Sequence, residues 1–289
     1  MEKVRQAMEL AIQQQWKHGP RREEGPPPPS PTARPPPAST AARPTARQLA
    51  SLDQSSKRKP IAKTGLERRL IPVSEEALAA NRLVAGVKSS VQREHYCLLQ
   101  ETVCEKLNAS CATRIGITGP SGSGKTLTAV NLAMILALEA RRQVLLIDLD
   151  LANPGIRQLF DLKDQPGIED VLFRGVRLGD ALFSPGIETL TVLPACGDSE
   201  AAGQMLHSPA LKELLAELAE RSEDALLVAD LPAIGSADDA QAYRSIMDAF
   251  LLVIEDGVTR EAEYRAALHA LEKSNLIGTV LNNAELPVS

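Results

Sequence analysis

The chain has 289 residues, a net charge of −5, and a hydrophobic content of 44% that includes few aromatic residues (3%). Such a length allows one large α/β domain or two small ones, and a core of Leu, Ile, Val and Ala suits a parallel sheet covered by helices. No apolar run approaches the roughly 18 residues of a membrane span, and the first residues lack the basic and apolar regions of a signal peptide. We therefore expect a cytoplasmic protein with no transmembrane segment of its own.

The first 70 residues differ in composition from the remainder. Residues 1–18 place apolar side chains at helical spacing, which predicts a short amphipathic helix that folds against a partner protein, against the domain, or not at all. Residues 19–70 are rich in proline, so we expect a linker with extended polyproline segments. Residues 20–60 hold eight Lys or Arg against three Asp or Glu, and a basic linker on an acidic body does not indicate specific nucleic-acid binding.

From residue 71 the pattern becomes that of a folded domain, which we expect to cover residues 71–289. Ser74 can cap a helix that begins at Glu75, and a longer helix is expected over residues 88–107. Apolar strands then alternate with amphipathic helices, which predicts an α/β fold with a central, mainly parallel sheet flanked by helices. The expected strands are 114–118, 143–148, 189–194, 225–230, 250–255 and 276–281. The expected helices are 125–139, 209–222, 237–247 and 260–273.

Residues 119–126 carry the most specific motif of the chain. They read Gly-Pro-Ser-Gly-Ser-Gly-Lys-Thr and match the G-x4-G-K-[ST] pattern of a P-loop, between a predicted strand and a predicted helix. The glycines let backbone N–H groups surround an anion, and the helix N-terminus adds partial positive charge. Lys125 is expected to reach the β- and γ-phosphates of ATP, and the Thr126 hydroxyl to ligate Mg²⁺. The residues of this segment expected to bind ATP are Gly119, Ser121, Gly122, Ser123, Gly124, Lys125, Thr126 and Leu127.

Two later strands end in carboxylates. One apolar strand leads into Asp148 and Asp150, and a second apolar strand ends at Asp230. The carboxyl ends of parallel strands share the sheet edge that carries the P-loop, where carboxylates can hold Mg²⁺ directly or through water and orient a nucleophile. We therefore expect Thr126, Asp148 and Asp230 to hold the metal, and Lys125, Asp148 and Asp150 to be catalytic.

Several stretches of the domain resemble one family of P-loop proteins. They are Ile-Asp-Leu-Asp-Leu-Ala-Asn-Pro at 147–154, Gly-Ile-Glu-Asp-Val-Leu at 167–172, Val-Leu-Pro-Ala at 192–195, Asp-Leu-Pro at 230–232 and Gly-Thr-Val-Leu-Asn at 278–282. Together they resemble the bacterial tyrosine autokinases (BY-kinases) of capsule and exopolysaccharide biosynthesis, within the deviant-Walker (Min/Par-like) ATPases. The type associated with exosortase loci is the most similar, and the resemblance covers residues 85–283.

The resemblance implies roles that the residues alone do not establish. Asp148 and Asp150 would act in a second Walker motif, with Asp148 near the attacking oxygen, and Asn282 would lie near the adenine. The family also implies a partner, which is a membrane polysaccharide chain-length regulator or another polysaccharide-assembly protein. Such a partner would recruit the chain to the inner face of the membrane, and self-association stays open.

The chain also departs from the family pattern. Ala152 stands where the second Walker motif usually has an arginine, and the oligomerising Glu-x-x-Arg-x-x-Arg helix, here 94–100, lacks both arginines. The sequence contains three tyrosines, Tyr96, Tyr243 and Tyr264, and no tyrosine cluster near residue 289. Two functions therefore stay open, which are Mg²⁺-dependent phosphoryl transfer from ATP to protein tyrosine or water, and a non-kinase, nucleotide-switched regulatory ATPase. Pro120 favours the kinase branch, because Min- and Par-type ATPases carry a lysine there.

Overall fold

The computed structural model describes residues 66–86, 90–162, 164–197, 205–222 and 225–284. The expected helix over residues 1–18 and most of the expected linker lie outside these residues. Within the described ranges, no helix has the length and apolar character that crossing a bilayer requires. The division of the chain at residue 71 stays a prediction, although Arg69 and Leu70 already pair with a strand of the domain.

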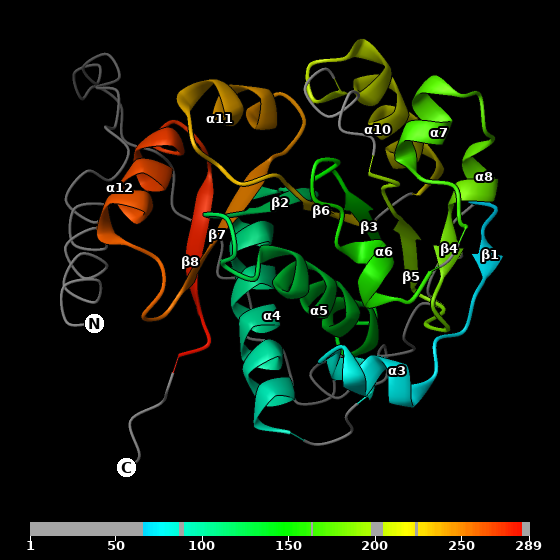
Figure 1. Cartoon of the computed structure of the whole chain (residues 1–289), viewed down its shortest axis with the longest axis horizontal. Coiled ribbons are helices and arrows are strands. Elements are labelled where there is room, and N and C mark those ends of the chain that lie inside the picture. The colour runs from blue at the N-terminus through cyan, green and yellow to red at the C-terminus, as the bar shows by residue number, and fades with distance from the viewer. Residues whose placement is uncertain (1–65, 87–89, 163, 198–204, 223–224, 285–289) are drawn as a thin grey trace, which may run out of the picture. The chain divides into compact units, whose positions relative to one another are not determined.

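An eight-stranded sheet forms the centre of the domain (Figure 1). Its spatial order is β1-β4-β5-β3-β6-β2-β7-β8, and all neighbours are parallel except β4 and β5. The expectation of a mainly parallel sheet is therefore confirmed. The strands are β1 Arg69–Leu70, β2 Arg114–Thr118, β3 Val144–Asp148, β4 Phe183–Ser184, β5 Leu190–Leu193, β6 Leu226–Asp230, β7 Ala249–Glu255 and β8 Leu276–Asn282.

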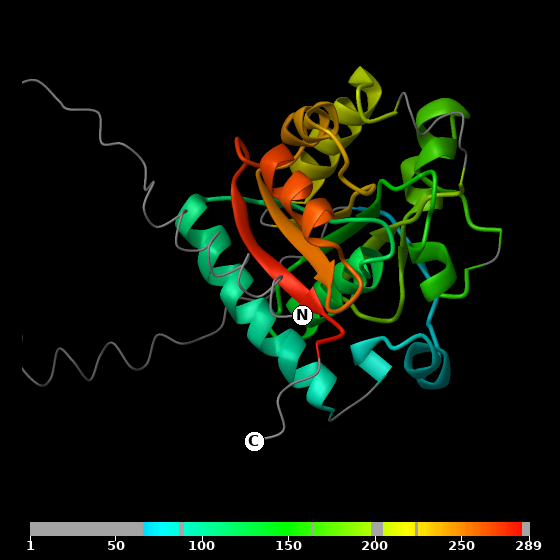
Figure 2. The same cartoon turned by 60° about the vertical axis from the view of Figure 1, so that its left-hand side comes forward.

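Helices cover both faces of the sheet (Figures 1 and 2). Helices α4 and α5 lie on one face, and α10, α11 and α12 lie on the other. The helices are α3 Glu75–Ala80, α4 Val91–Ser110, α5 Lys125–Leu138, α6 Ile156–Leu159, α7 Ile168–Phe173, α8 Leu178–Ala181, α10 Pro209–Arg221, α11 Ala237–Arg244 and α12 Glu261–Ala270, with the 3-10 turn η1 at Val84–Gly86.

Local capping explains where several helices begin. The Ser74 hydroxyl accepts a hydrogen bond from the Ala77 N–H at 3.2 Å, as expected for the cap of α3. The Ser90 hydroxyl accepts a hydrogen bond from the Arg93 N–H at 3.0 Å and so caps α4. The helix therefore begins at Val91 and not at residue 88. Helices α11 and α12 are also shorter than expected, because each ends in a turn before its apolar pattern stops.

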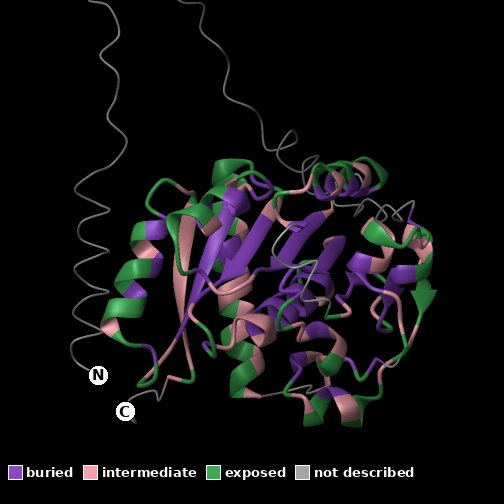
Figure 3. Ribbon diagram, turned by 45° about the horizontal axis from the view of Figure 1, so that its top comes forward, coloured by how far each residue is buried: buried purple, intermediate pink, exposed green. Residues whose placement is uncertain are grey.

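The core lies around the central strands, which Figure 3 shows as a buried block. Every residue of β3 and β6 is buried, whereas all of the edge strand β8 is only half-buried. Helix α5 is buried from Thr128 to Ala137, which is typical of a helix that is packed on every side. Because α5 follows the P-loop directly, its buried stretch begins one turn after the loop.

Candidate nucleotide-binding site

The loop between β2 and α5 has a geometry that depends on glycine. Gly124 has φ +84°, and a Cβ there would lie 2.1 Å from Nδ2 of Asn282. A Cβ on Gly119 would lie 2.1 Å from the carbonyl oxygen of Val253 in β7. Gly122 also has a positive φ of +77°, but open space surrounds it. The loop therefore approaches neighbouring backbone and side chains too closely for larger residues.

Lys125 and Asp150 lie together at the start of α5. The Lys125 Nζ is 3.2 Å from the Asp150 Oδ2, and the two side chains are 12% and 2% exposed. The Asn153 N–H donates to the other Asp150 oxygen at 3.2 Å. The structure thus brings together two residues that the sequence places in separate motifs.

Asp148 ends β3 and is held from two sides. Its carboxylate accepts hydrogen bonds from the Asp150 N–H at 3.1 Å and the Ile156 N–H at 3.2 Å. Burial raises the pKa of Asp148 well above its ordinary value, and the charge of Asp230 adds to this effect. The parallel register of β3 and β6 explains the effect of the Asp230 charge, because Asp148 and Asp230 are directly paired Cα partners.

Asp230 ends β6 and is fully buried, yet neither of its oxygens has a hydrogen-bond partner within the described residues. Burial raises the pKa of Asp230 to about 7, while the charge of Lys125 and the nearby Thr126 hydroxyl, which has no regular hydrogen-bond geometry to either oxygen, lower it. A buried, unsatisfied carboxylate is costly unless a cation or an ordered water accompanies it. Both oxygens are therefore available to a metal ion, either directly or through water.

The donor set suits a magnesium ion that shares its ligands with phosphates. No group of three His, Cys, Asp or Glu side chains in the described ranges could hold a metal on its own. Mg²⁺ usually binds through one or two carboxylates, waters and substrate phosphates, and so does not need such a group. The Thr126 hydroxyl and the free oxygens of Asp230 fit this kind of site.

Asn282 links the edge strand β8 to the P-loop. Its side-chain N–H donates to the carbonyl oxygen of Ser123 at 3.1 Å. The Ser123 hydroxyl is buried and has no partner among the described atoms. Asn282 therefore lies against the loop, although its proposed proximity to the adenine stays a prediction.

A cavity of about 340 Å³ opens beside the loop. Gly122, Gly124, Lys125, Thr126 and Leu127 of the predicted set line it, whereas Gly119, Ser121 and Ser123 do not. The sequence motifs did not indicate the other lining residues. These are Asn81, Arg82, Gly155, Gln158 and Leu159.

The loops beyond β3 and β5 are joined by a polar cluster. Glu169 of α7 is 1% exposed and accepts N–H bonds from Cys196 and Gly197 at 2.8–2.9 Å. The Arg157 Nη2 lies 3.0 Å from the Cys196 Sγ. Burial and the neighbouring Asp170 raise the pKa of the Cys196 thiol to about 12, so the thiol stays protonated and is not a nucleophile.

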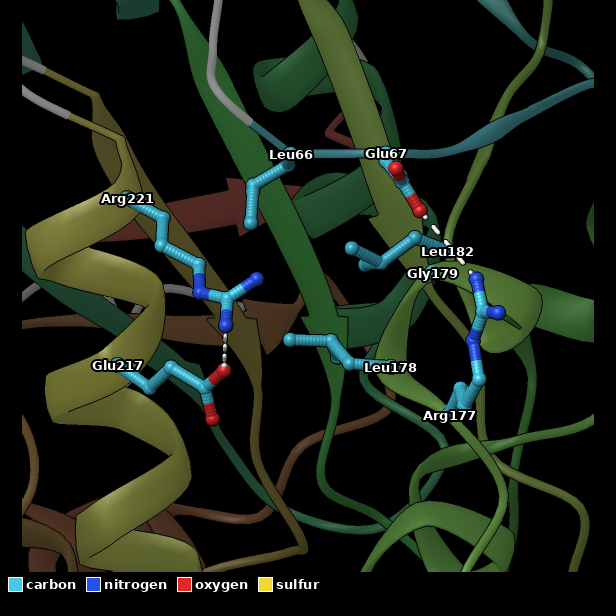
Figure 4. Close-up of a pocket in the computed structure, with 8 residues that line it drawn as sticks. All are labelled: Leu66, Glu67, Arg177, Leu178, Gly179, Leu182, Glu217 and Arg221. Carbon is cyan, nitrogen blue, oxygen red and sulfur yellow. Dashed lines mark hydrogen bonds and ion pairs between the residues drawn. The ribbon is translucent and has the colours of Figure 1, made fainter.

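Figure 4 shows a second cavity, of about 270 Å³, that lies between α8, α10 and the segment before β1. Its lining residues are Leu66, Glu67, Arg177, Leu178, Gly179, Leu182, Glu217 and Arg221. Both arginines form ion pairs, Arg177 with Glu67 at 3.3 Å and Arg221 with Glu217 at 2.7 Å. No residue of the P-loop or of the three aspartates borders this cavity, so we assign no nucleotide chemistry to it.

Comparison with known proteins identifies the class of this domain. Residues 116–286 match the CobQ/CobB/MinD/ParA nucleotide-binding domain family, to which the chain therefore belongs. Within this class the chain is a member of the bacterial tyrosine-kinase family, because it is 32% identical over 167 residues to the tyrosine-protein kinase YwqD of Bacillus subtilis (strain 168). This alignment covers 57% of the chain and 69% of YwqD.

Two further relatives agree with this placement. The chain is 31% identical over 195 residues to the succinoglycan biosynthesis transport protein ExoP of Rhizobium meliloti (strain 1021), which covers 63% of the chain but about a quarter (24%) of ExoP. The crystal structure of the VpsO kinase domain superposes with a TM-score of 0.59 at 26% identity, and covers 68% of the chain and 97% of that domain. The more specific resemblance to exosortase-associated proteins stays a prediction.

Proposed function

We propose that this chain binds ATP with Mg²⁺ and transfers the γ-phosphoryl group to a protein tyrosine or to water, as part of exopolysaccharide or capsule biosynthesis. The observation that carries the proposal is the pair of unpartnered Asp230 oxygens, which are buried close to Thr126 and Lys125. Membership of a nucleotide-binding family supports the nucleotide, and the names of YwqD and ExoP support the reaction and the process.

Each residue has a distinct role in this proposal. Thr126 and Asp230 would hold Mg²⁺, with Asp148 as a further ligand, directly or through water. When bound, Mg²⁺ neutralises charge on the phosphates. Lys125 exchanges its contact with Asp150 for the β- and γ-phosphates, and Asp150 stays close to the amine. Backbone donors hold the Asp148 carboxylate in place, so that it can take the proton of an attacking hydroxyl.

Two of the three tyrosines of this chain are too deeply buried to accept the phosphoryl group. Tyr243 and Tyr264 are 1% and 3% exposed, and burial raises the pKa of both phenols. Neither can enter an active site without local unfolding. Tyr96 on α4 is half-buried, so it and the tyrosines of a partner protein are the candidate acceptors.

A partner in polysaccharide assembly follows from the same relatives. The name of ExoP, a succinoglycan biosynthesis transport protein, supports a polysaccharide-assembly protein as the partner, and the family resemblance implies a membrane chain-length regulator. Such a partner would bring the chain to the inner face of the membrane.

Phosphoryl transfer from labelled ATP tests the proposal. We expect label on a tyrosine polymer or a partner protein, together with some free phosphate, when the chain is incubated with ATP and Mg²⁺. Asp148→Asn should keep the nucleotide and lose most of the transfer, because a residue that positions the nucleophile acts mainly in the transition state. Glu105→Gln, which alters an exposed carboxylate on α4, is the matched control.

The two functions left open by the sequence give different results. Hydrolysis without label on any protein would identify a regulatory ATPase and contradict the kinase. Wild-type activity in Asp148→Asn would contradict the assignment of the site itself.

A further inference from the structure

The nucleotide cavity has a cationic residue that belongs to no nucleotide-binding motif. Arg82 lines the cavity together with Lys125, and these two are the only cations among its described lining residues. Lys125 already faces Asp150. The Arg82 guanidinium, in contrast, has no hydrogen bond or ion pair with any residue in the described ranges, and the residue is exposed. A cation without a partner among the described residues therefore borders the space beside the phosphate loop.

The backbone holds Arg82 in a conformation that usually requires glycine. The residue follows α3 with φ 58°, the Arg82 N–H donates to the Ala79 carbonyl at 3.0 Å, and the Leu83 N–H donates to the Leu78 carbonyl at 2.8 Å. This pair of bonds is the Schellman motif, in which glycine is the usual residue. Cys111 has the same conformation after α4, so the conformation alone does not mark a site. It does fix the direction in which the side chain leaves the backbone.

Buried polar contacts attach this turn to the helix that follows the P-loop. Asn131 of α5 is 0% exposed, accepts the Val84 N–H at 2.9 Å and donates to the Arg82 carbonyl at 3.2 Å. Leu127 lies one helical turn before Asn131, on the same face of α5, and lines the cavity. The backbone of Arg82 is therefore fixed beside the second turn of α5, one turn after the residues of this helix that line the cavity.

A second contact attaches the same turn to the other side of the cavity. The Asn81 side chain donates to the Leu159 carbonyl of α6 at 2.9 Å. Gly155, just before α6, is so close to Thr126 that a Cβ would lie 2.7 Å from the Thr126 methyl group. The turn that carries Arg82 is thus connected to both elements that surround Thr126.

We propose that Arg82 binds the phosphate groups of the nucleotide as a second cation beside Lys125. The proposal rests on the proposed function, because it assumes that ATP or ADP occupies this cavity. A guanidinium offers several N–H donors in a planar arrangement that matches two phosphate oxygens, which makes arginine well suited to this contact. A carboxylate of a partner protein could also pair with Arg82, but its shared cavity with Lys125 and Thr126 favours the nucleotide.

Replacement of Arg82 by glycine separates the side chain from the backbone. Glycine adopts the left-handed conformation without strain, so Arg82→Gly removes the guanidinium and keeps the turn. We expect the affinity for Mg-ADP, measured by titration calorimetry, to fall about tenfold, as for the loss of one charge-assisted contact. The unfolding temperature of the free protein should be unchanged or higher. Arg82→Lys should bind Mg-ADP more tightly than Arg82→Gly does, because lysine retains the positive charge.

Arg141 provides a matched control. It is also an exposed arginine with a positive φ, of 48°, and it does not line the cavity. Arg141→Gly should bind Mg-ADP like the wild type. If Arg82→Gly does not fold, Arg82→Asn serves instead, because asparagine also accepts the left-handed conformation.

The outcomes separate this inference from the proposed function. Affinity of Arg82→Gly within twofold of the wild type would overturn the inference and would leave the P-loop site intact. An equal loss in Arg141→Gly would also overturn it, because the effect would then not depend on the cavity. A wild-type protein that binds no nucleotide would instead contradict the proposed function.

Discussion

Asp230 combines a cost in stability with a proposed role in metal binding. Its buried carboxylate has no hydrogen-bond partner in the described part of the chain, and it directly faces Asp148 in the neighbouring strand. A native protein retains an arrangement of this kind where function requires it, and such sites are commonly less stable than neutral variants. The residue therefore links the stability of the free domain to its affinity for a cation.

Asp230→Asn should change both the stability of the free protein and its Mg²⁺-dependent affinity for ATP. The change removes a buried charge and keeps the shape of the side chain, so we expect the free protein to be stabilised by about 1 kcal/mol. The same variant should no longer bind ATP more tightly when Mg²⁺ is added. Thermal unfolding in a chelator and nucleotide titrations with and without Mg²⁺ measure the two effects. Lower stability together with intact dependence on Mg²⁺ would contradict the role of Asp230.

Lys125 should contribute to nucleotide affinity more than any exposed lysine. Lys125→Ala leaves phosphate charge without its cation and also leaves the buried Asp150 without its partner. We expect the affinity for ATP to fall at least tenfold, because one such contact is commonly worth about 1.5–3 kcal/mol. Lys106→Ala, on the exposed face of α4, is the control for calorimetry. Equal affinity in a folded Lys125→Ala would show that the phosphates bind elsewhere.

The sequence predicts the long elements well and the short ones poorly. Strand β2 matches the expected range, and β3 and β6 begin one residue late, because apolar runs between polar turns define their ends. Strands β1 and β4 have two residues each, and α6 and α8 have four, which is too short for a hydrophobic period to show. Their positions depend on tertiary packing, which the local pattern does not contain.

The sequence likewise predicts only some of the residues of the candidate site. The P-loop and the strand-end aspartates have a motif or a position in the sheet that the sequence reveals, and their proximity follows from the parallel strands. Arg82 and Gln158 have no such signal, because packing of η1 and α6 against α5 brings them to the cavity. The only local sign at Arg82 is its place directly beyond a well-capped helix.

At the start of β2, one carboxylate fixes the strand to its neighbour. Asp248 accepts hydrogen bonds from the Thr113 and Arg114 N–H groups at 3.1 and 2.9 Å, and from the Arg114 guanidinium at 2.6 Å. Burial alone would raise the pKa of Asp248, but the hydrogen bonds and the charge of Arg114 lower it below its ordinary value. The position of β2 and hence of the P-loop depends in part on this group.

Asp248→Asn should destabilise the fold at neutral pH by about 1–2 kcal/mol, since it removes charge-assisted hydrogen bonds. Because the folded pKa is depressed, the contribution of Asp248 is present above its unfolded pKa and is lost as pH falls through the folded pKa. The difference between wild type and variant, measured by urea unfolding, should therefore shrink below about pH 4. A difference that is constant from pH 7 to pH 3 would show that the charge of Asp248 does not contribute.

At the scale of the molecule, the parallel sheet gathers the whole candidate site at one edge. Strands β2, β3 and β6 are adjacent and all end there, so Thr126, Asp148 and Asp230 approach one another although they come from distant parts of the sequence. Strand β8 ends at the same edge and brings Asn282 against the loop. The second cavity (Figure 4) lies between α8, α10 and the segment before β1, and its charges are already paired. In the proposed site the chemistry therefore lies at one edge, and we expect an acceptor to approach that edge.

The distribution of tyrosines over the fold predicts which of them receive phosphate. Tyr243 packs in α11 with its hydroxyl 3.4 Å from the Pro232 carbonyl, and Tyr264 packs in α12, so both rings are part of the core. Phosphorylation of either tyrosine would place a doubly charged group in an apolar interior. The region around the tyrosine would therefore have to unfold locally first. We expect phosphopeptide mapping after incubation with ATP and Mg²⁺ to find no label on these two residues. Label should instead lie on Tyr96 or on an added acceptor protein. In Tyr96→Phe, label should lie only on the added acceptor protein. Rapid labelling of Tyr243 or Tyr264 at a temperature at which the domain is fully folded would contradict this assignment.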